Sequence, residues 1–276
     1  AAVAEQIAGE IVFLGTPAEE RGSGKQFMIE DGLFEGVDAA LLYHPSDRNQ
    51  VRVVALASVD VEVTFTGVQS HAAADPWKGK NALDALVLLF GSIGLWRQQL
   101  RPEARVHGIV LEGGTAANII PARTVGRFML RSFDQQYFEE MKARFRDLVQ
   151  AAALATGCTG EAVFSGGSRT MKHNQAIGER WAANMAAYGV VEDEPEESFG
   201  STDMGNVSHV CPAIHPYLAI CDQAVPSHSV EFRDAAASRR ADDTTILAAT
   251  LVAETAFDLF ADPELVKAAW REFAGG

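Results

Sequence analysis

The chain has 276 residues, with 23 Lys and Arg against 37 Asp and Glu, and therefore a formal net charge of −14. An acidic chain repels polyphosphate, which argues against nucleic-acid binding. Hydrophobic residues make up 47% and charged residues 22%, which is typical of a globular protein and too apolar for a disordered one. Three scattered cysteines without a CxxC pair favour a reducing, cytoplasmic location. The longest apolar run, residues 86–96, is too short to span a bilayer, so we expect no membrane association.

The first part of the chain predicts the beginning of a parallel α/β layer. Residues 1–7 are typical of the end of a helix, and 10–15 form a short apolar run that predicts a buried strand. A polar loop over 16–24 leads into a short helix at 25–31, and a second buried strand is expected at 38–43. Strand, loop, helix and strand in this order indicate a parallel sheet.

The middle of the chain has a different order of elements. We expect strands and helices alternating as β-α-β-β-α-β, at residues 59–66, 81–100, 105–111, 124–132, 134–155 and 161–164. This order is the ferredoxin-like pattern. Because α/β segments flank it on both sides, we expect a small domain over 57–168 inserted into a larger one formed by 1–56 and 169–276.

The last third predicts further helices and one strand. Helices are expected at 176–188, 241–260 and 263–273, an acidic loop at 192–197 and a strand at 214–221. The predicted fold class is therefore α/β, with a mixed sheet in the larger, hydrolase-like domain and the ferredoxin-like domain inserted into it.

Polar residues follow the predicted strands of the larger domain. Glu19 and Glu20 come after the first strand, and adjacent carboxylates repel unless something compensates their charge. A metal would do so, with one carboxylate as ligand and the other as general base, whereas the alternative is a solvated acidic loop. His44 follows the second strand, and carboxyl ends of parallel strands meet at one edge. His228 follows strand 214–221; it is a further candidate ligand or else a polar loop histidine.

Two side chains of the inserted domain could contact a substrate. His71 lies just past a strand and could donate a hydrogen bond to a developing oxyanion, or it could stabilise its own loop. Asn118 lies in a glycine-rich turn and serves either the turn or a substrate. Arg131 shares one strand face with Arg127 and is a candidate anchor for a carboxylate.

The loop over 200–209 is rich in glycine and hydroxyl groups. Ser201 and Asp203 are its candidate substrate-binding residues. The loop lacks the lysine and the spacing of a phosphate-binding loop, so that interpretation is weak. We assign the nearby His209 and His215 to packing.

Several strings together resemble one family. They are GTPAEERGSGK, DAALLYHP, GVQSHAAADPWKGKNALDA, GGTAANIIPA, GSTDMGNVSHVCPAIHPY and PSHSVEF. The chain resembles the aminoacylase/carboxypeptidase-G-type family of co-catalytic metallopeptidases, in the amidohydrolase branch of aminobenzoyl-glutamate hydrolases and β-alanyl-dipeptide hydrolases. The resemblance implies a two-metal α/β domain with a ferredoxin-like lid that usually forms a homodimer.

The resemblance also implies roles for single residues. Glu19 would be the general base, and Glu20, His44 and His228 metal ligands, with two zinc or manganese ions in the full-length protein. His71 and Asn118 would contact the substrate, an N-acyl amino acid or dipeptide-like amide hydrolysed by metal-activated water. The motif Cys-Gly-His or His-x-Asp that relatives carry upstream is not found before Glu19, so we expect a fragment lacking the first third of the catalytic domain. The alternative function is a catalytically incomplete chain that acts as a dimerisation or small-molecule binding module.

Overall fold

The computed structural model describes residues 8–194 and 200–275, so the predicted helix end at 1–7 and part of the acidic loop lie outside the described residues. The chain divides into two compact units. Unit 1 comprises Ala1–Glu19, Ser23–Ala55 and Met171–Gly276, and unit 2 comprises Glu20–Gly22 and Leu56–Thr170.

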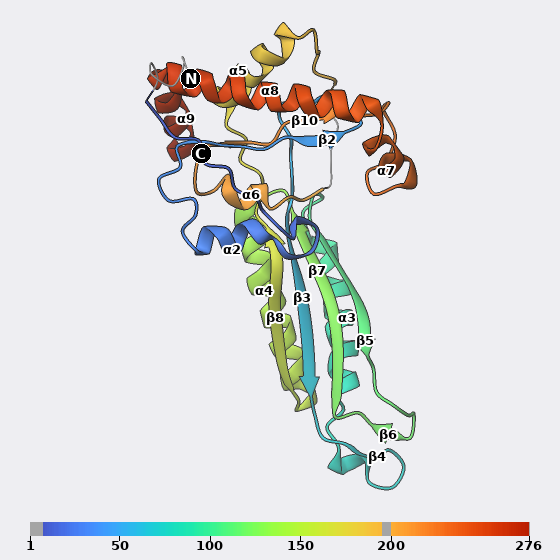
Figure 1. The fold of residues 1–276 in the computed structure, drawn as a ribbon. Coiled ribbons are helices and arrows are strands. Elements are labelled where there is room, and N and C mark those ends of the chain that lie inside the picture. Colours follow the sequence, from blue (N-terminus) through green and yellow to red (C-terminus); the bar gives the residue numbers. More distant parts are fainter. Residues whose placement is uncertain (1–7, 195–199, 276) are drawn as a thin grey trace. The chain divides into compact units, whose positions relative to one another are not determined.

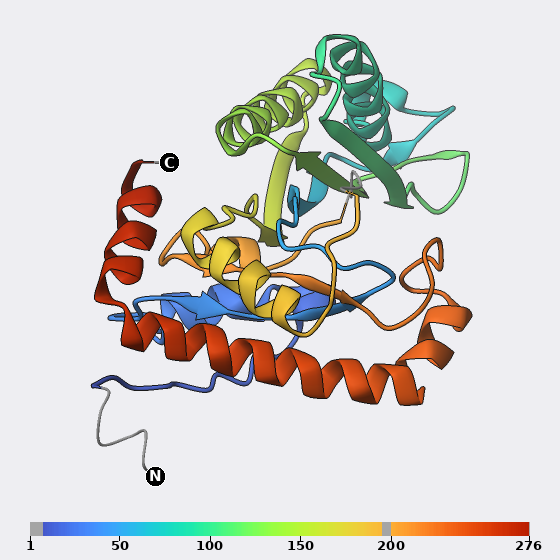
Figure 2. The ribbon, with the colours of Figure 1, turned by 90° about the horizontal axis from the view of Figure 1, so that it is seen from above.

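Unit 2 contains a four-stranded antiparallel sheet. Its strands are β3 (Ala57–Thr66), β5 (Arg105–Glu112), β7 (Arg123–Ser132) and β8 (Thr159–Ser168), in the order β5-β7-β3-β8. The helices α3 (Ala82–Trp96), which continues into η2 (Arg97–Gln99), and α4 (Gln135–Thr156) cover one face of this sheet (Figure 1 and Figure 2). The chain order β-α-β-β-α-β is the predicted ferredoxin-like one.

Local sequence signals explain where the helices of unit 2 begin and end. The Asn81 side chain accepts a hydrogen bond from the Leu83 amide at 3.0 Å, and Asp134 accepts one from Tyr137 at 2.9 Å. These are N-caps, which satisfy amides that the first helical turn leaves free. Gly157, at φ 69°, ends α4 in the left-handed conformation that glycine adopts without strain. The core between sheet and helices is apolar and fully buried, with Val61, Val63, Phe65, Leu86, Leu89 and Phe145 all at 0% exposure.

A short pair of strands extends from the same unit. β4 (Ser70–His71) pairs antiparallel with β6 (Ile119–Ile120), and the 3-10 helix η1 (Pro76–Lys78) follows β4. Neither strand was predicted, because two residues are too few to show an alternating pattern.

Unit 1 contains a parallel two-stranded ribbon built from distant parts of the chain. β1 (Ala40–Leu41) pairs with β9 (Ala213–Ile214), and β2 (His44–Ser46) pairs with β10 (Tyr217–Ala219). Both ladders have the same register, because every partner lies 173 positions further along the chain. The ladder is interrupted where Pro216 has no amide hydrogen, although the Pro216 carbonyl still accepts the His44 amide at 3.0 Å.

Helices surround this ribbon. The longer ones are α5 (Gln175–Ala187), α8 (Arg239–Ala261) and α9 (Pro263–Gly275), all close to their predicted bounds, while α2 (Gly24–Glu30), α6 (Met204–Val207) and α7 (Val230–Ala236) are short. α8 packs against α5, α9 and β10 (Figure 1), with Ala248 and Leu251 buried. By length and composition alone α8 could cross a membrane, although core helices of soluble proteins pass the same test.

The strand predicted at residues 10–15 is wrong. These residues form neither helix nor strand, and the side chains of Ile11 and Phe13 are 73% and 93% exposed. An apolar run becomes a strand only where a neighbouring strand satisfies its amides and carbonyls. Within residues 8–194 and 200–275 the ladders do not include this segment.

Candidate active site

A buried ion pair joins the start of α2 to the residue that precedes α6 in unit 1. The Lys25 ammonium lies 2.7 Å from Asp203 Oδ1, and the Lys25 amide donates to Asp203 Oδ2 at 3.0 Å. The side chains are 6% and 0% exposed. The Asp203 carboxylate, predicted to bind substrate, therefore accepts hydrogen bonds on both oxygens from one residue. Pairing of this kind is what allows two charges to be buried.

The tight turn before α2 brings Lys25 to this position. Ser23 has a left-handed backbone, at φ 51°, and Gly24 follows it. A Cβ atom at Gly24 would lie 1.9 Å from the Pro17 carbonyl oxygen, so only glycine fits here. The sequence GSGK after the two glutamates is thus the local reason for the course of the chain.

Three rings gather where the ribbon is interrupted. The centroids of His44 and His215 are 5.7 Å apart, and Tyr217 lies 5.1 Å from His44 and 5.6 Å from His215. His44 is exposed, Tyr217 is half-buried and His215 is 2% exposed. The cluster lies between the carboxyl ends of β1 and β9 and the first residues of β2 and β10. The carboxyl ends of parallel strands are where sites in parallel sheets lie.

His215 is a neutral imidazole in this cluster. Burial, together with the charges of His44 and Lys25, lowers the pKa of His215 to about 3. Both of its ring nitrogens are buried and lack a hydrogen-bond partner in the part of the chain that the structure describes. Buried polar atoms are nearly always paired in native proteins, so this pair of nitrogens calls for an explanation.

The two adjacent glutamates lie in the short helix α1 (Glu19–Gly22). Glu19 is half-buried and Glu20 is exposed. Burial raises the pKa of Tyr217, and the negative charge of Glu19 raises it further, so Glu19 belongs to the surroundings of the ring cluster. Ala18, immediately before α1, has a left-handed backbone at φ 58°, a strained conformation for a residue with a Cβ atom.

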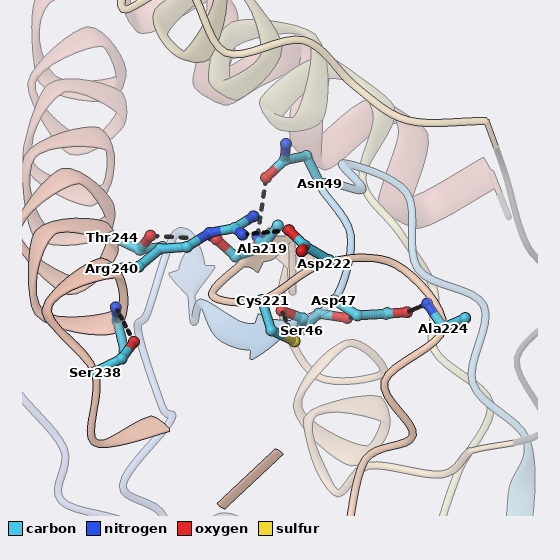
Figure 3. Close-up of polar contacts among 11 residues, drawn as sticks. Ser46, Asp47, Asn49, Ala219, Cys221, Asp222, Ala224, Ser238, Arg240 and Thr244 are labelled. Atoms are coloured by element: carbon cyan, nitrogen blue, oxygen red, sulfur yellow. Dashed lines mark hydrogen bonds and ion pairs between the residues drawn. The ribbon is translucent and has the colours of Figure 1, made fainter. Parts of the chain in front are cut away.

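A polar network holds the loop that follows β10, which leads to His228 (Figure 3). The Asp47 carboxylate accepts the Ala224 amide at 2.8 Å, and Asp222 pairs with Arg240 at 2.8 Å. Asn49 Oδ1 accepts the Ala219 amide at 2.9 Å. His228 itself is exposed and has a left-handed backbone at φ 61°. The network ties this loop to the end of β2 and to α8.

In unit 2 the structure brings His71 and Asn118 together. The Asn118 carbonyl accepts the Ala72 amide at 3.0 Å, next to the paired strands β4 and β6. His71 Nδ1 accepts the amides of Ala73 and Ala74 at 3.2 and 3.1 Å. An acceptor nitrogen carries no proton, so in the neutral ring the proton is on Nε2. The exposed His71 ring thus presents an N–H donor, as an oxyanion contact requires.

The remaining predicted substrate contacts are less defined. Arg131 Nε lies 3.1 Å from the Met129 sulfur on the outer face of β7. Arg127, on the same face, pairs with Glu62 of β3 at 3.2 Å. Ser201 is exposed in the loop before α6. Their roles stay predictions.

The candidate ligands do not form a metal centre by themselves. Within residues 8–194 and 200–275, no three His, Cys, Asp or Glu side chains gather closely enough to hold a metal ion. The described residues alone therefore do not complete a metal site.

Comparison with known proteins confirms the family resemblance. Residues 57–157 match the model of a peptidase dimerisation domain of the M20 type. The chain is 38% identical to human Xaa-Arg dipeptidase over 272 residues, which is 96% of this chain and 62% of that protein. It is 30% identical to one chain of the p-aminobenzoyl-glutamate hydrolase of Escherichia coli over 191 residues, 68% of this chain and 40% of that protein. The chain thus contains an M20 peptidase dimerisation domain, and its homologues are named peptidases and hydrolases.

Solved structures agree on the fold. An M20-family peptidase from Bacillus subtilis, described as binding a dinuclear metal, superposes with a TM-score of 0.65 at 17% identity over 89% of this chain and 64% of its own. An aminobenzoyl-glutamate utilization protein from Klebsiella pneumoniae gives 0.66 at 22% identity, over 81% of this chain and 60% of its own. At these identities the likeness establishes the α/β fold.

Sequence reasoning missed Lys25 and assigned His215 to packing. One signal could have found His215: the dipeptide His-Pro occurs at 44–45 and again at 215–216. These dipeptides follow β1 and β9, which pair with each other. Lys25 carried no comparable signal, because a lysine after a glycine-rich turn is ordinarily exposed.

Proposed function

We propose that the whole protein is a hydrolase of small amides, a dipeptidase or an amidohydrolase acting on N-acyl amino acids. The observation that supports this most is the 38% identity to Xaa-Arg dipeptidase over 96% of the chain. A second relative, 28% identical over 205 residues, is an N-acetyl-L-cysteine deacetylase of Bacillus subtilis. Both names describe enzymes that hydrolyse an amide bond to an amino acid. The chain spans 62% of the human relative's length, so the activity is proposed for the whole protein.

In this proposal Glu19 is the general base. Its carboxylate takes a proton from the attacking water, whose oxygen forms a bond to the amide carbon. The oxyanion accepts a hydrogen bond from His71 Nε2 of the same chain or of the partner in a dimer. The carbon–nitrogen bond then breaks, and Glu19 returns the proton to the leaving amine. The products are a carboxylic acid and an amine, and Glu19 is regenerated.

Divalent metals are part of the proposal for the whole protein. The family resemblance supports two zinc or manganese ions, with Glu20, His44 and His228 among the ligands. Such ions would lower the pKa of a bound water and polarise the substrate carbonyl. Imidazole and carboxylate ligands suit several divalent metals, so the donor set does not select one.

We further propose a cytoplasmic homodimer formed through unit 2, without nucleic-acid or membrane partners. Apolar side chains of unit 2 support the dimer, since Ile109, Val110 and Leu111 of β5 are 60%, 51% and 44% exposed. Val87 and Leu95 of α3 are 61% and 68% exposed. Extended exposed apolar surface commonly marks an interaction site.

The general base is tested by Glu19→Gln in the whole protein. Removal of a general base should lower kcat by about 10²–10⁴-fold on a dipeptide with a free carboxylate. The matched control is Glu10→Gln, the same change at an exposed glutamate, and it should leave kcat unaltered. Hydrolysis by Glu19→Gln at the wild-type rate would contradict the assignment. A dimer that hydrolyses nothing with zinc or manganese added would favour the binding-module alternative.

A further inference from the structure

The ring of His215 is the least explained polar group of unit 1. Both nitrogens are buried without a partner among the described residues, and the side chain is only 2% exposed. A neutral imidazole always has one N–H to donate and one nitrogen to accept. Leaving both nitrogens unpaired in a buried position is unfavourable. We therefore expect a partner for them that the described residues of the chain do not supply.

Two residues with hydrogen-bond donors belong to the surroundings of His215: Lys25, whose charge acts on the His215 ring, and Tyr217, whose ring packs against it. The Lys25 ammonium has three N–H bonds, and one is directed at Asp203 Oδ1 at 2.7 Å. Asp203 Oδ2 already accepts the Lys25 amide, so this acid has a hydrogen bond on each oxygen. Tyr217, whose ring lies 5.6 Å from that of His215, adds a hydroxyl donor. An acceptor would pair with the His215 N–H and with these donors, while the second ring nitrogen of His215 can itself accept from one of them.

We propose that Lys25, His215 and Tyr217 form a subsite for the free carboxylate of the substrate or of the amino-acid product. The inference rests on the proposed function, because dipeptides and N-acyl amino acids carry such a carboxylate. Two carboxylate oxygens can accept hydrogen bonds from several donors at once, and charge-assisted bonds of this kind are strong. The positive charge of Lys25 offsets the negative charge of Glu19, which acts on Tyr217 and raises the pKa of its hydroxyl.

The cluster is open to solvent on one side. His44 is exposed and Tyr217 is half-buried, and both rings contact His215. A ligand can thus approach over His44 and Tyr217 while Lys25 and Asp203 stay buried. The competing occupant is a buried water, which commonly pairs such orphaned groups.

The experiment measures binding without turnover. The probes are glycyl-arginine and its C-terminal amide, which differ only in the carboxylate, titrated in EDTA into the full chain with histidine rings labelled for NMR. The acid should bind about 10- to 100-fold more tightly than the amide and shift the His215 ring signals. His215→Leu and Tyr217→Phe should each lower the affinity for the acid by about tenfold or more and leave the affinity for the amide unaltered. Tyr188→Phe, the same change at a tyrosine that bonds Glu254, is the control.

Each other result overturns the proposal. Equal affinity for acid and amide, or no saturable binding of the acid, leaves a buried water as the occupant. Loss of discrimination in Arg131→Met but not in Tyr217→Phe places the carboxylate elsewhere. Tyr217→Phe keeps the ring and so serves as the test if His215→Leu does not fold.

Failure of this subsite is distinguishable from failure of the proposed function. If the whole protein hydrolyses dipeptide and dipeptide amide with equal kcat/KM, the hydrolase stands and the subsite falls. If it hydrolyses neither but the chain still prefers the acid, the subsite stands and the hydrolase falls.

Discussion

At the scale of single residues, the Lys25–Asp203 pair is the most consequential contact of unit 1. The two side chains are almost completely buried and lie 178 positions apart in the chain. Their carboxylate and ammonium hold the start of α2 against the loop before α6. A contact of this kind depends on both partners, because removing one leaves a buried charge unpaired.

We therefore expect Lys25→Met to lower the free energy of unfolding by roughly 3–5 kcal/mol. Urea unfolding followed by circular dichroism measures this. The double variant Lys25→Met with Asp203→Leu should lose less than the single one, because it leaves no unpaired charge. Arg239→Met, which breaks the exposed pair with Asp243, should change the stability by less than about 1 kcal/mol. A single variant as stable as the double one would contradict this account.

The sequence could point to candidate site residues only where a reactive side chain comes directly after a predicted strand. His44 was expected directly after a strand, and it is the first residue of β2, two residues beyond the end of β1. His71 and Asn118 lie side by side, and their contact with a substrate stays a prediction. The burial of Lys25 and Asp203 could not be predicted, because it arises from packing between segments far apart in the chain. The lack of hydrogen-bond partners for the His215 nitrogens could not be predicted either, because it too depends on how distant segments pack around the ring.

At the scale of elements, long periodic segments were predicted well and short ones were not. The bounds of α3, α4, α5 and α8 follow from caps and apolar periodicity that the sequence displays. The strand expected over residues 38–43 is formed only by β1, and β2 begins just beyond it at His44. The strand expected over 214–221 is divided into β9 and β10, because the ladder is interrupted beside Pro216. Residues 10–15 show that an apolar run alone does not make a strand.

Two helical glycines should respond in opposite directions to the same substitution. A Cβ at Gly178 of α5 would lie 2.3 Å from His173 Nε2, whereas one at Gly94 of α3 meets nothing within 4 Å. Gly178→Ala should therefore destabilise the protein by roughly 1–3 kcal/mol through overpacking. Gly94→Ala should stabilise it by up to about 1 kcal/mol, because alanine favours the helix.

Thermal unfolding of the two glycine variants, followed at one wavelength beside the wild type, measures both effects. Gly91→Ala, also without a neighbour within 4 Å, repeats the Gly94 result as an internal control. A Gly178→Ala protein as stable as the wild type would mean that His173 moves aside without cost.

At the scale of the whole molecule, the expected assembly is a dimer through unit 2. Ile109→Lys places a charge in the exposed apolar row of β5 and should raise the dimer dissociation constant by at least about tenfold. Ile246→Lys makes the same change at an exposed position of α8 in unit 1, at 68% exposure, and should leave the dimer intact. Light scattering after size exclusion reports the mass. A wild-type chain that stays monomeric at every concentration would refute the prediction.

The constant offset of 173 positions between ribbon partners has a consequence for how the chain is made on the ribosome. Residues 40–46 cannot find their partners until residues 213–219 have been synthesised. At about 5–20 residues per second this delay is roughly 10–35 seconds. The contiguous segment Leu56–Thr170 of unit 2 is translated completely within that interval. We therefore expect unit 2 to fold first, while residues 40–46 wait unpaired and depend on chaperones for protection.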